Sequence, residues 1–203
     1  MANRTLMEFF RSQYTRRDNF LARLFALFSE ETIRIWCRDP SSPYEDMGRP
    51  TIYRLGESSR GQTLDFTLRS RRDGRILVAE MKCEITFENY KSMTLVDHSQ
   101  LERHAAGRAF EMFLDLASAP ESYKVMVKGK QVSVAGSVLV WGAVSPQGRE
   151  DVLAHTAIRD VLSVEDAISK LLADRNPEYL AFVEERRRWC GELFDFLASP
   201  ATS

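Results

Sequence analysis

The sequence predicts a mixed α/β domain, in which helices cover a sheet with both antiparallel and parallel strands. Three observations support this class: an amphipathic helical stretch over residues 18–38, strand-like alternation between residues 50 and 85, and an apolar run at Val138–Trp141 between later helical segments. The length of 203 residues suits a single domain. We expect its core to span about residues 18–145 and a C-terminal helical part to span about 148–198.

The composition is that of an ordinary globular protein with little net charge. There are 28 Lys and Arg residues against 29 Asp and Glu residues, so the formal net charge is −1. This balance excludes a general polycation, but nucleic-acid binding needs only a local basic face. The three cysteines have no paired spacing, and the N-terminus has no signal-peptide core. We therefore expect a cytoplasmic protein with reduced thiols and no membrane segment.

The first long helix is predicted over Asp18–Arg38. Phe20, Leu24, Leu27 and Ile35 recur at helical spacing and form an apolar stripe. The helix is expected to end before Pro40, because proline cannot continue the hydrogen-bond ladder.

Three strands are predicted next, over Thr51–Leu55, Gln62–Ser70 and Arg75–Ile85. The pair Asp73-Gly74 favours a two-residue hairpin turn between the second and third strands. Leu64, Phe66 and Leu68 are then expected on one face of the second strand and Asp65 on the other.

The hairpin register brings three charged residues onto one face of the predicted sheet. A two-residue loop puts Asp65 opposite Lys82 and diagonal to Glu80, whereas a four-residue loop puts Asp65 opposite Glu80. Both even-numbered loops leave Asp65, Glu80 and Lys82 on the same face. The alternative reading is a salt-bridged surface without function.

The later elements complete the mixed pattern. A helix is predicted over Asp97–Ala117, a hairpin over Tyr123–Val134 and a buried strand over Val138–Trp141. Ser163 is expected to cap a short helix, and Asn176-Pro177 to open the last helix, which runs to about Leu197.

Two carboxylates and one ammonium group on an apolar sheet suit metal-assisted phosphodiester hydrolysis. Hard carboxylate oxygens are preferred ligands of Mg²⁺, and a neighbouring lysine can hold a water molecule and stabilise negative charge. Soft-metal chemistry is not expected here, because neither His nor Cys belongs to this set.

At these residues the sequence resembles the PD-(D/E)XK nuclease superfamily, which has the restriction-endonuclease-like fold. The match is Thr63-Leu64-Asp65-Phe66 for one motif and Val78-Ala79-Glu80-Met81-Lys82 for the next. The resemblance implies a core of one helix, three strands, a helix and a strand, followed here by added C-terminal helices. It also implies that Asp65, Glu80 and the Met81 carbonyl bind the metal and that Lys82 is catalytic. Leu64 stands where some members have proline.

Two further positions follow from the same resemblance. Many members add an acid from the first helix, and Glu31 is the first candidate here, with Glu30 next; a solvated helix-surface acid is the alternative. A RecB-like subset carries Gln-x-x-x-Tyr on the following helix, where this chain has Gln100 and His104. One helical turn would place Gln100 and His104 on one face, within reach of the metal site or the DNA backbone. His98 and His155 receive no role from the sequence.

The expected function is therefore a Mg²⁺-dependent nuclease that cleaves DNA, with Mn²⁺ as a substitute ion. Homodimerisation would suit double-strand cleavage. Five arginines and two aspartates over residues 60–75 suggest a phosphate-binding rim, although solvated strand ends explain them equally well. The alternatives are a catalytically silent nuclease-fold module that binds DNA or protein, and an interaction module with a chance acidic face. Endonuclease or exonuclease action, DNA or RNA preference and the pathway stay open.

Overall fold

A five-stranded mixed sheet lies at the centre of the protein. The computed structural model describes residues 5–10, 14–57, 60–83 and 93–199. The strand order is β1-β4-β5-β9-β11; β1/β4 and β4/β5 are antiparallel, and β5/β9 and β9/β11 are parallel. The strands are β1 (Tyr44–Gly48), β4 (Phe66–Ser70), β5 (Ile76–Lys82), β9 (Ser137–Trp141) and β11 (Asp160–Ser163).

Two smaller sheets accompany the central one. The four-stranded sheet has the order β3-β2-β7-β8 and is antiparallel, and β6 pairs with β10 in parallel. Their strands are β2 (Pro50–Arg54), β3 (Gln62–Thr63), β6 (Thr94–Leu95), β7 (Tyr123–Val127), β8 (Lys130–Val132) and β10 (Ala143–Val144).

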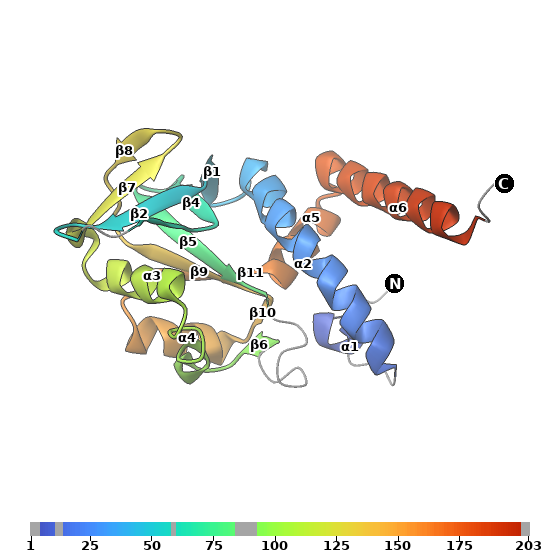
Figure 1. Ribbon diagram of the computed structural model, residues 1–203, viewed down its shortest axis with the longest axis horizontal. Helices are drawn as coiled ribbons and strands as arrows, with labels where there is room; N and C mark the ends of the chain where they lie inside the picture. The colour runs from blue at the N-terminus through green and yellow to red at the C-terminus, as the bar shows by residue number, and fades with distance from the viewer. Residues whose placement is uncertain (1–4, 11–13, 58–59, 84–92, 200–203) are drawn as a thin grey trace.

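Helices cover the central sheet on both sides. In Figure 1, α2 runs along one side with α5 beside it and α6 outermost, while α3 and α4 lie on the other side. The helical elements are α1 (Leu6–Phe10), α2 (Thr15–Arg38), η2 (His98–Leu101), α3 (Arg108–Ser118), η3 (Pro120–Ser122), α4 (Pro146–His155), α5 (Val164–Ala173) and α6 (Pro177–Ala198).

Strand alternation separates two large clusters of buried side chains, one on each face of the central sheet. On β5, Leu77 and Ala79 pack with α2 and α5, whereas Val78 packs with α3 and the second sheet. Glu80 and Lys82 follow Val78 at every second position of the strand, so all three side chains lie on the α3 side of the sheet. The face assignment predicted for this strand is confirmed.

Several predicted elements are confirmed with small changes in their bounds. The first long helix is α2, the hairpin after α3 is β7–β8, and the buried apolar strand is β9. Ser163 caps α5 by accepting a hydrogen bond from the backbone N–H of Asp166. The mixed α/β class is confirmed by the sheet and its helices.

The three strands after the first helix are not the three that the sequence predicts. The predicted strand at Thr51–Leu55 is β2, which belongs to the second sheet, and β1 takes the edge position beside β4. The predicted strand at Gln62–Ser70 is divided into β3 and β4, which pair in different sheets. The division occurs because the N–H of Leu64 donates to the carbonyl of Pro50 at 3.0 Å. Leu64 consequently packs in the α3-side core, away from Phe66 and Leu68.

The turn between β4 and β5 has four residues, so the prediction of a two-residue Asp-Gly turn is wrong. Phe66 pairs with Ala79 and Arg69 with Ile76. The N–H of Ser70 donates to the carbonyl of Arg75, and the N–H of Gly74, at φ 72°, donates to the carbonyl of Ser70. This is the alternative register, in which Asp65 faces Glu80.

The segment predicted as a helix over Asp97–Ala117 is mostly not α-helical. It contains the short η2, then turns over residues 102–107, and α3 begins only at Arg108. Asp97 and Gln100 form a capping box that closes η2 in 3₁₀ geometry. The expected C-terminal helical part also contains β11, which extends the central sheet. Glu84 and Ile85, at the end of the predicted third strand, lie outside the described residues.

Candidate metal centre

Asp65 stands where the chain leaves the second sheet and enters β4. In the observed register Met81 would pair with Leu64, but Leu64 is turned toward Pro50. Oδ2 of Asp65 accepts the Met81 N–H instead, at 2.8 Å. The break in the strand thus positions the Asp65 carboxylate against the end of β5.

Glu80 is the most buried ionisable residue of this group, at 7% exposure. Burial is the main cause that raises the pKa of its carboxyl above the usual value, and the nearby negative charge of Asp65 adds to it. Lys82 opposes this effect, since its Nζ lies 2.9 Å from Oε1 of Glu80. The structure therefore brings Asp65, Glu80 and Lys82 together at one end of β5.

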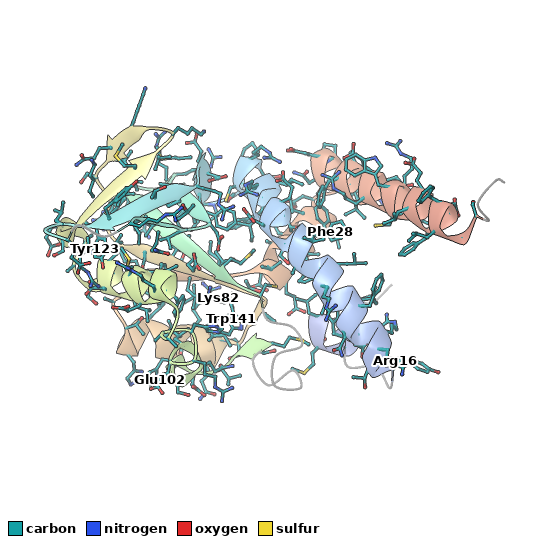
Figure 2. All side chains as sticks on the ribbon, viewed as in Figure 1. Arg16, Phe28, Lys82, Glu102, Tyr123 and Trp141 are labelled. Carbon is teal, nitrogen blue, oxygen red and sulfur yellow. The ribbon has the colours of Figure 1, made fainter. Side chains whose placement is uncertain are left out.

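Lys82 lies beside aromatic residues. It pairs in register with Trp141 of β9, and Figure 2 labels the two residues near the same end of the sheet. Its Nζ lies 5.3 Å from the ring centroid of Phe110 on α3, within cation–π range. Phe110 is a site neighbour that the sequence analysis did not single out, because its apolar spacing indicates only a core residue.

Arg49 is a second residue that sequence reasoning missed. Its Nη2 lies 3.4 Å from Oδ1 of Asp65, and its Nη1 lies 3.9 Å from Oε1 of Glu30. The side chain is about half-exposed, at 52%. Arg49 therefore connects Asp65 to α2, and no spacing pattern in the sequence indicates this.

The backbone of Met81 is well oriented for its predicted role. The N–H and C=O of one residue in a strand point toward the same neighbouring strand. Because the Met81 N–H points to Asp65, the Met81 carbonyl lies on the same edge of β5. Asp65, Glu80 and this carbonyl supply oxygen donors only, which fits a hard divalent cation such as Mg²⁺.

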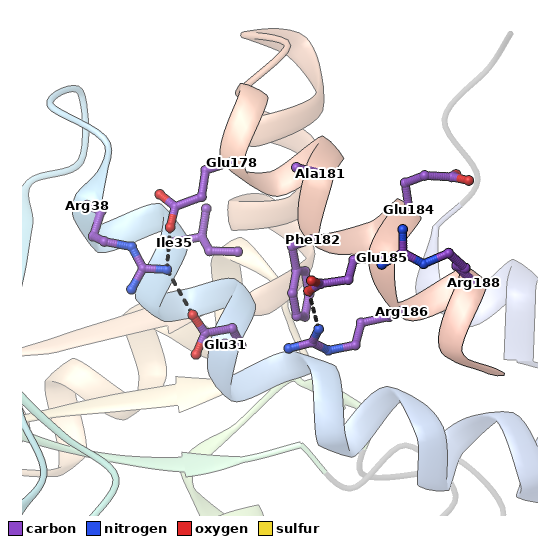
Figure 3. Close-up of a pocket in the computed structure, with 10 residues that line it drawn as sticks. All are labelled: Glu31, Ile35, Arg38, Glu178, Ala181, Phe182, Glu184, Glu185, Arg186 and Arg188. Carbon is purple, nitrogen blue, oxygen red and sulfur yellow. Dashed lines mark hydrogen bonds and ion pairs between the residues drawn. The ribbon is translucent and has the colours of Figure 1, made fainter. Parts of the chain in front are cut away.

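Glu31 faces a different part of the molecule. It forms ion pairs with Arg34 at 3.5 Å and with Arg38 at 2.8 Å, and Arg38 also reaches Glu178 of α6. Figure 3 shows Arg38 between Glu31 and Glu178 in the cleft between α2 and α6. Of the two acids considered on the first helix, Glu30 is the one that connects, through Arg49, to Asp65.

The buried side chain of Gln100 is occupied by nearby backbone groups. Its Oε1 accepts the Val96 N–H at 2.7 Å and its Nε2 donates to the Thr94 carbonyl at 3.1 Å. The expectation that one helical turn aligns Gln100 and His104 is wrong, because residues 102–107 are not helical. His104 nevertheless packs edge-on against Phe110 and Trp141, the two rings beside Lys82.

The arginine-rich segment over residues 60–75 does not surround this site as a whole. Arg71 and Arg75 lie at the turn before β5, whereas Lys82 ends that strand, roughly 20 Å away at the usual rise per residue. Arg71 donates to the Cys37 carbonyl and Arg75 pairs with Asp73. The positions of Arg71 and Arg75 are therefore better explained by solvated strand ends and local pairing than by a phosphate-binding rim around Asp65.

Comparison of the chain with family models, with curated proteins and with solved structures gives no match. Among the described residues, no helix combines the length and the apolar character needed to cross a bilayer.

Proposed function

We propose that this protein is a metal-dependent nuclease that hydrolyses phosphodiester bonds in DNA, with Mg²⁺ as its ion and Mn²⁺ as a substitute. The observation that carries the proposal is the convergence of Asp65, Glu80 and Lys82 at one end of β5. A cation between the two carboxylates would offset the cost of burying Glu80 beside another negative charge.

The order of elements in the central sheet supports a restriction-endonuclease-like core. A long helix, α2, precedes three antiparallel strands, β1, β4 and β5. Helix α3 then follows, and β9 adds to β5 in parallel. This order agrees with the helix–three strands–helix–strand core that the PD-(D/E)XK resemblance implies, and on this proposal β2, β3, β7 and β8 would form an inserted sheet.

Each residue has a defined role in the proposed reaction. Asp65, Glu80 and the Met81 carbonyl would hold the cation, which lowers the pKa of a bound water and neutralises charge on the phosphate. Lys82 would position the attacking water and stabilise negative charge on the phosphate oxygens. Arg49, partly exposed beside Asp65, would bind a phosphate of the DNA backbone.

The second candidate is a catalytically silent module that uses the same surface to bind DNA or protein. It is favoured by the internal neutralisation of the site, where Arg49 pairs with Asp65 and Lys82 with Glu80. A cytoplasmic location and a homodimer complete the main proposal. The three free cysteines are consistent with a reducing compartment.

The test is a cleavage assay on plasmid and single-stranded DNA with Mg²⁺ or Mn²⁺. We expect Asp65→Asn and Lys82→Ala each to lower the rate by at least about 100-fold, as removal of a charge-stabilising catalytic group does. Glu45→Gln and Lys124→Ala are the matched controls, because Lys124 is exposed, the Glu45 side chain is 47% exposed, and neither residue pairs with Asp65 among the described contacts. They should cleave at the wild-type rate.

Each outcome decides between the candidates. Cleavage that persists unchanged in Asp65→Asn and Lys82→Ala overturns the assignment. DNA binding by a folded wild-type protein, without cleavage in either metal, favours the silent module.

A further inference from the structure

Two histidines and one aspartate converge on the α3 side of the fold, outside the proposed nuclease centre. His98 comes from η2, and Asp151 and His155 come from α4. Nδ1 of His98 lies 2.7 Å from Oδ2 of Asp151, and Nδ1 of His155 lies 3.2 Å from Oδ1 of the same carboxylate. One ligand atom from each residue lies within 4.8 Å of the other two.

Helix geometry and one backbone hydrogen bond hold the three side chains of the cluster together. Asp151 and His155 are four residues apart on α4 and therefore share a face of the helix. The His98 N–H donates to Oδ2 of Asp151 at 2.7 Å, which fixes the carboxylate relative to η2. The two imidazole rings are stacked, with centroids 4.4 Å apart and planes 17° from parallel. Both Nδ1 atoms thus lie beside one carboxylate before any ion binds, and Nδ1 of His155 also lies 2.9 Å from the backbone carbonyl oxygen of Asp151.

We propose that His98, Asp151 and His155 bind a transition-metal ion of the Zn²⁺ class. Imidazole nitrogen favours such ions, in contrast to the all-oxygen set around Asp65. Tetrahedral zinc with ligand bonds of about 2.1 Å separates its ligand atoms by about 3.4 Å. The two nitrogen–oxygen separations of 2.7 and 3.2 Å must widen slightly to reach this value, and the ligand atoms of the two histidines already lie within 4.8 Å of each other.

The exposure of the three side chains permits that opening and leaves a coordination position accessible. His98 is 41% exposed and His155 is 54% exposed, while Asp151 is less exposed at 25%. Three protein ligands with a solvent-facing fourth position match the pattern of open zinc sites. The bound ion would cross-link η2 to α4 and so stabilise this side of the fold.

The test uses tag-free protein, because the chain has only three histidines and each can be followed separately. We would titrate ZnCl₂ by calorimetry and record ¹⁵N-histidine ring spectra during the titration. We expect one equivalent to bind, His98 and His155 to shift, and the His104 signals to stay in place. Zn²⁺ should also raise the Tm, and EDTA should reverse this rise.

Variants separate this site from the proposed nuclease centre. His98→Gln, His155→Gln and Asp151→Asn should each weaken Zn²⁺ binding by at least about tenfold. Asp65→Asn should leave it unchanged, so failure of the nuclease proposal would not affect this result. If the ring signals of folded wild-type protein do not respond to ZnCl₂, the triad is only a hydrogen-bonded cluster and the proposal is overturned. Zn²⁺ binding that is equally strong in Asp151→Asn also overturns it.

Discussion

The backbone N–H of Met81 donates a 2.8 Å hydrogen bond to Oδ2 of Asp65. This contact replaces the ladder bond that Leu64 would have accepted if β3 and β4 were one strand. The carboxylate therefore has a structural function as well as the proposed catalytic one, since it satisfies a backbone donor at the end of the ladder. Asp65→Asn keeps an oxygen that can accept the Met81 N–H but removes the negative charge for the metal. Asp65→Ala would remove both, so Asn is the better test of the catalytic role.

Arg49→Gln should strengthen metal binding and weaken cleavage. The Arg49 guanidinium lies 3.4 Å from Asp65, so it competes with a cation for that carboxylate. An exposed ion pair is worth up to about 1 kcal/mol, so removing it should tighten the Mn²⁺ Kd by up to about fivefold. The cleavage rate should fall, because a phosphate contact is lost. Calorimetry with Mn²⁺ and a DNA cleavage assay measure the two effects. Weaker Mn²⁺ binding in Arg49→Gln would contradict the competition.

Glu80→Gln should change the pH dependence of stability in metal-free protein. Burial and the charge of Asp65 raise the pKa of Glu80, so the folded state holds its proton more tightly than the unfolded state. This contribution is fully present below the unfolded pKa of about 4.3 and is lost as the pH rises through the folded pKa. Glutamine does not ionise, so Glu80→Gln should gain stability relative to wild type between pH 4 and pH 8.

Urea unfolding in EDTA at several pH values measures this difference. Glu45→Gln is the matched control, because the Glu45 side chain on β1 is about half-exposed and, among the described residues, forms its ion pair with the similarly exposed Arg69. Its stability relative to wild type should change little with pH. A Glu80→Gln difference that is the same at pH 4 and pH 8 would refute the electrostatic interpretation. Mg²⁺ should stabilise wild type and leave Glu80→Gln unaffected.

Phe110→Leu should lower the cleavage rate by about two- to thirtyfold. The Phe110 ring lies 5.3 Å from Nζ of Lys82, and cation–π contacts of this kind are worth about 0.5–2 kcal/mol. Phe110 is thus a positioning residue, which acts on the reaction only through Lys82. The neighbouring Phe113→Leu is the control, because both rings are buried in the same core and stack at 5.4 Å. Both variants should lose stability by about 1 kcal/mol, but only Phe110→Leu should lose rate. Equal loss of rate in both variants would assign the effect to packing alone.

Local periodicity predicted the parts of the fold that depend on nearby residues. Apolar residues at helical spacing identified α2, but the stripe drawn through them is partly wrong, since Phe20 is 48% exposed and Leu27 is 76% exposed. Strict alternation placed Glu80 and Lys82 on one face of β5. Those two residues, with Asp65, are the portion of the candidate site that the sequence predicted. Any even number of loop residues leaves Asp65, Glu80 and Lys82 on one face. The wrong turn length therefore did not change the predicted site.

The remaining features depend on contacts that lie far apart in the sequence. Strand β1, with the sequence Tyr-Glu-Asp-Met-Gly, shows no apolar alternation and is recognised only by its pairing with β4. The break at Leu64 depends on Pro50, and the choice between Glu30 and Glu31 depends on where Arg49 and α6 lie. The Asp151 and His155 spacing was visible in the sequence, but its partner His98 is 53 residues away from Asp151.

Two glycine-to-alanine substitutions in helices should have opposite effects on stability. A Cβ on Gly148 of α4 would lie 2.1 Å from the Leu95 carbonyl oxygen of β6, a backbone atom that cannot move away cheaply. Gly148→Ala should therefore cost several kcal/mol, as severe overpacking does. A Cβ on Gly191 of α6 would meet no atom of the described residues within 4 Å beyond its own stretch of helix, so Gly191→Ala should gain up to about 1 kcal/mol of helix propensity. Urea unfolding of the two variants and wild type measures both effects. Equal stability of Gly148→Ala and wild type would mean that α4 does not pack directly on β6. In that case the approach of His155 to His98, which depends on the same packing, would also need revision.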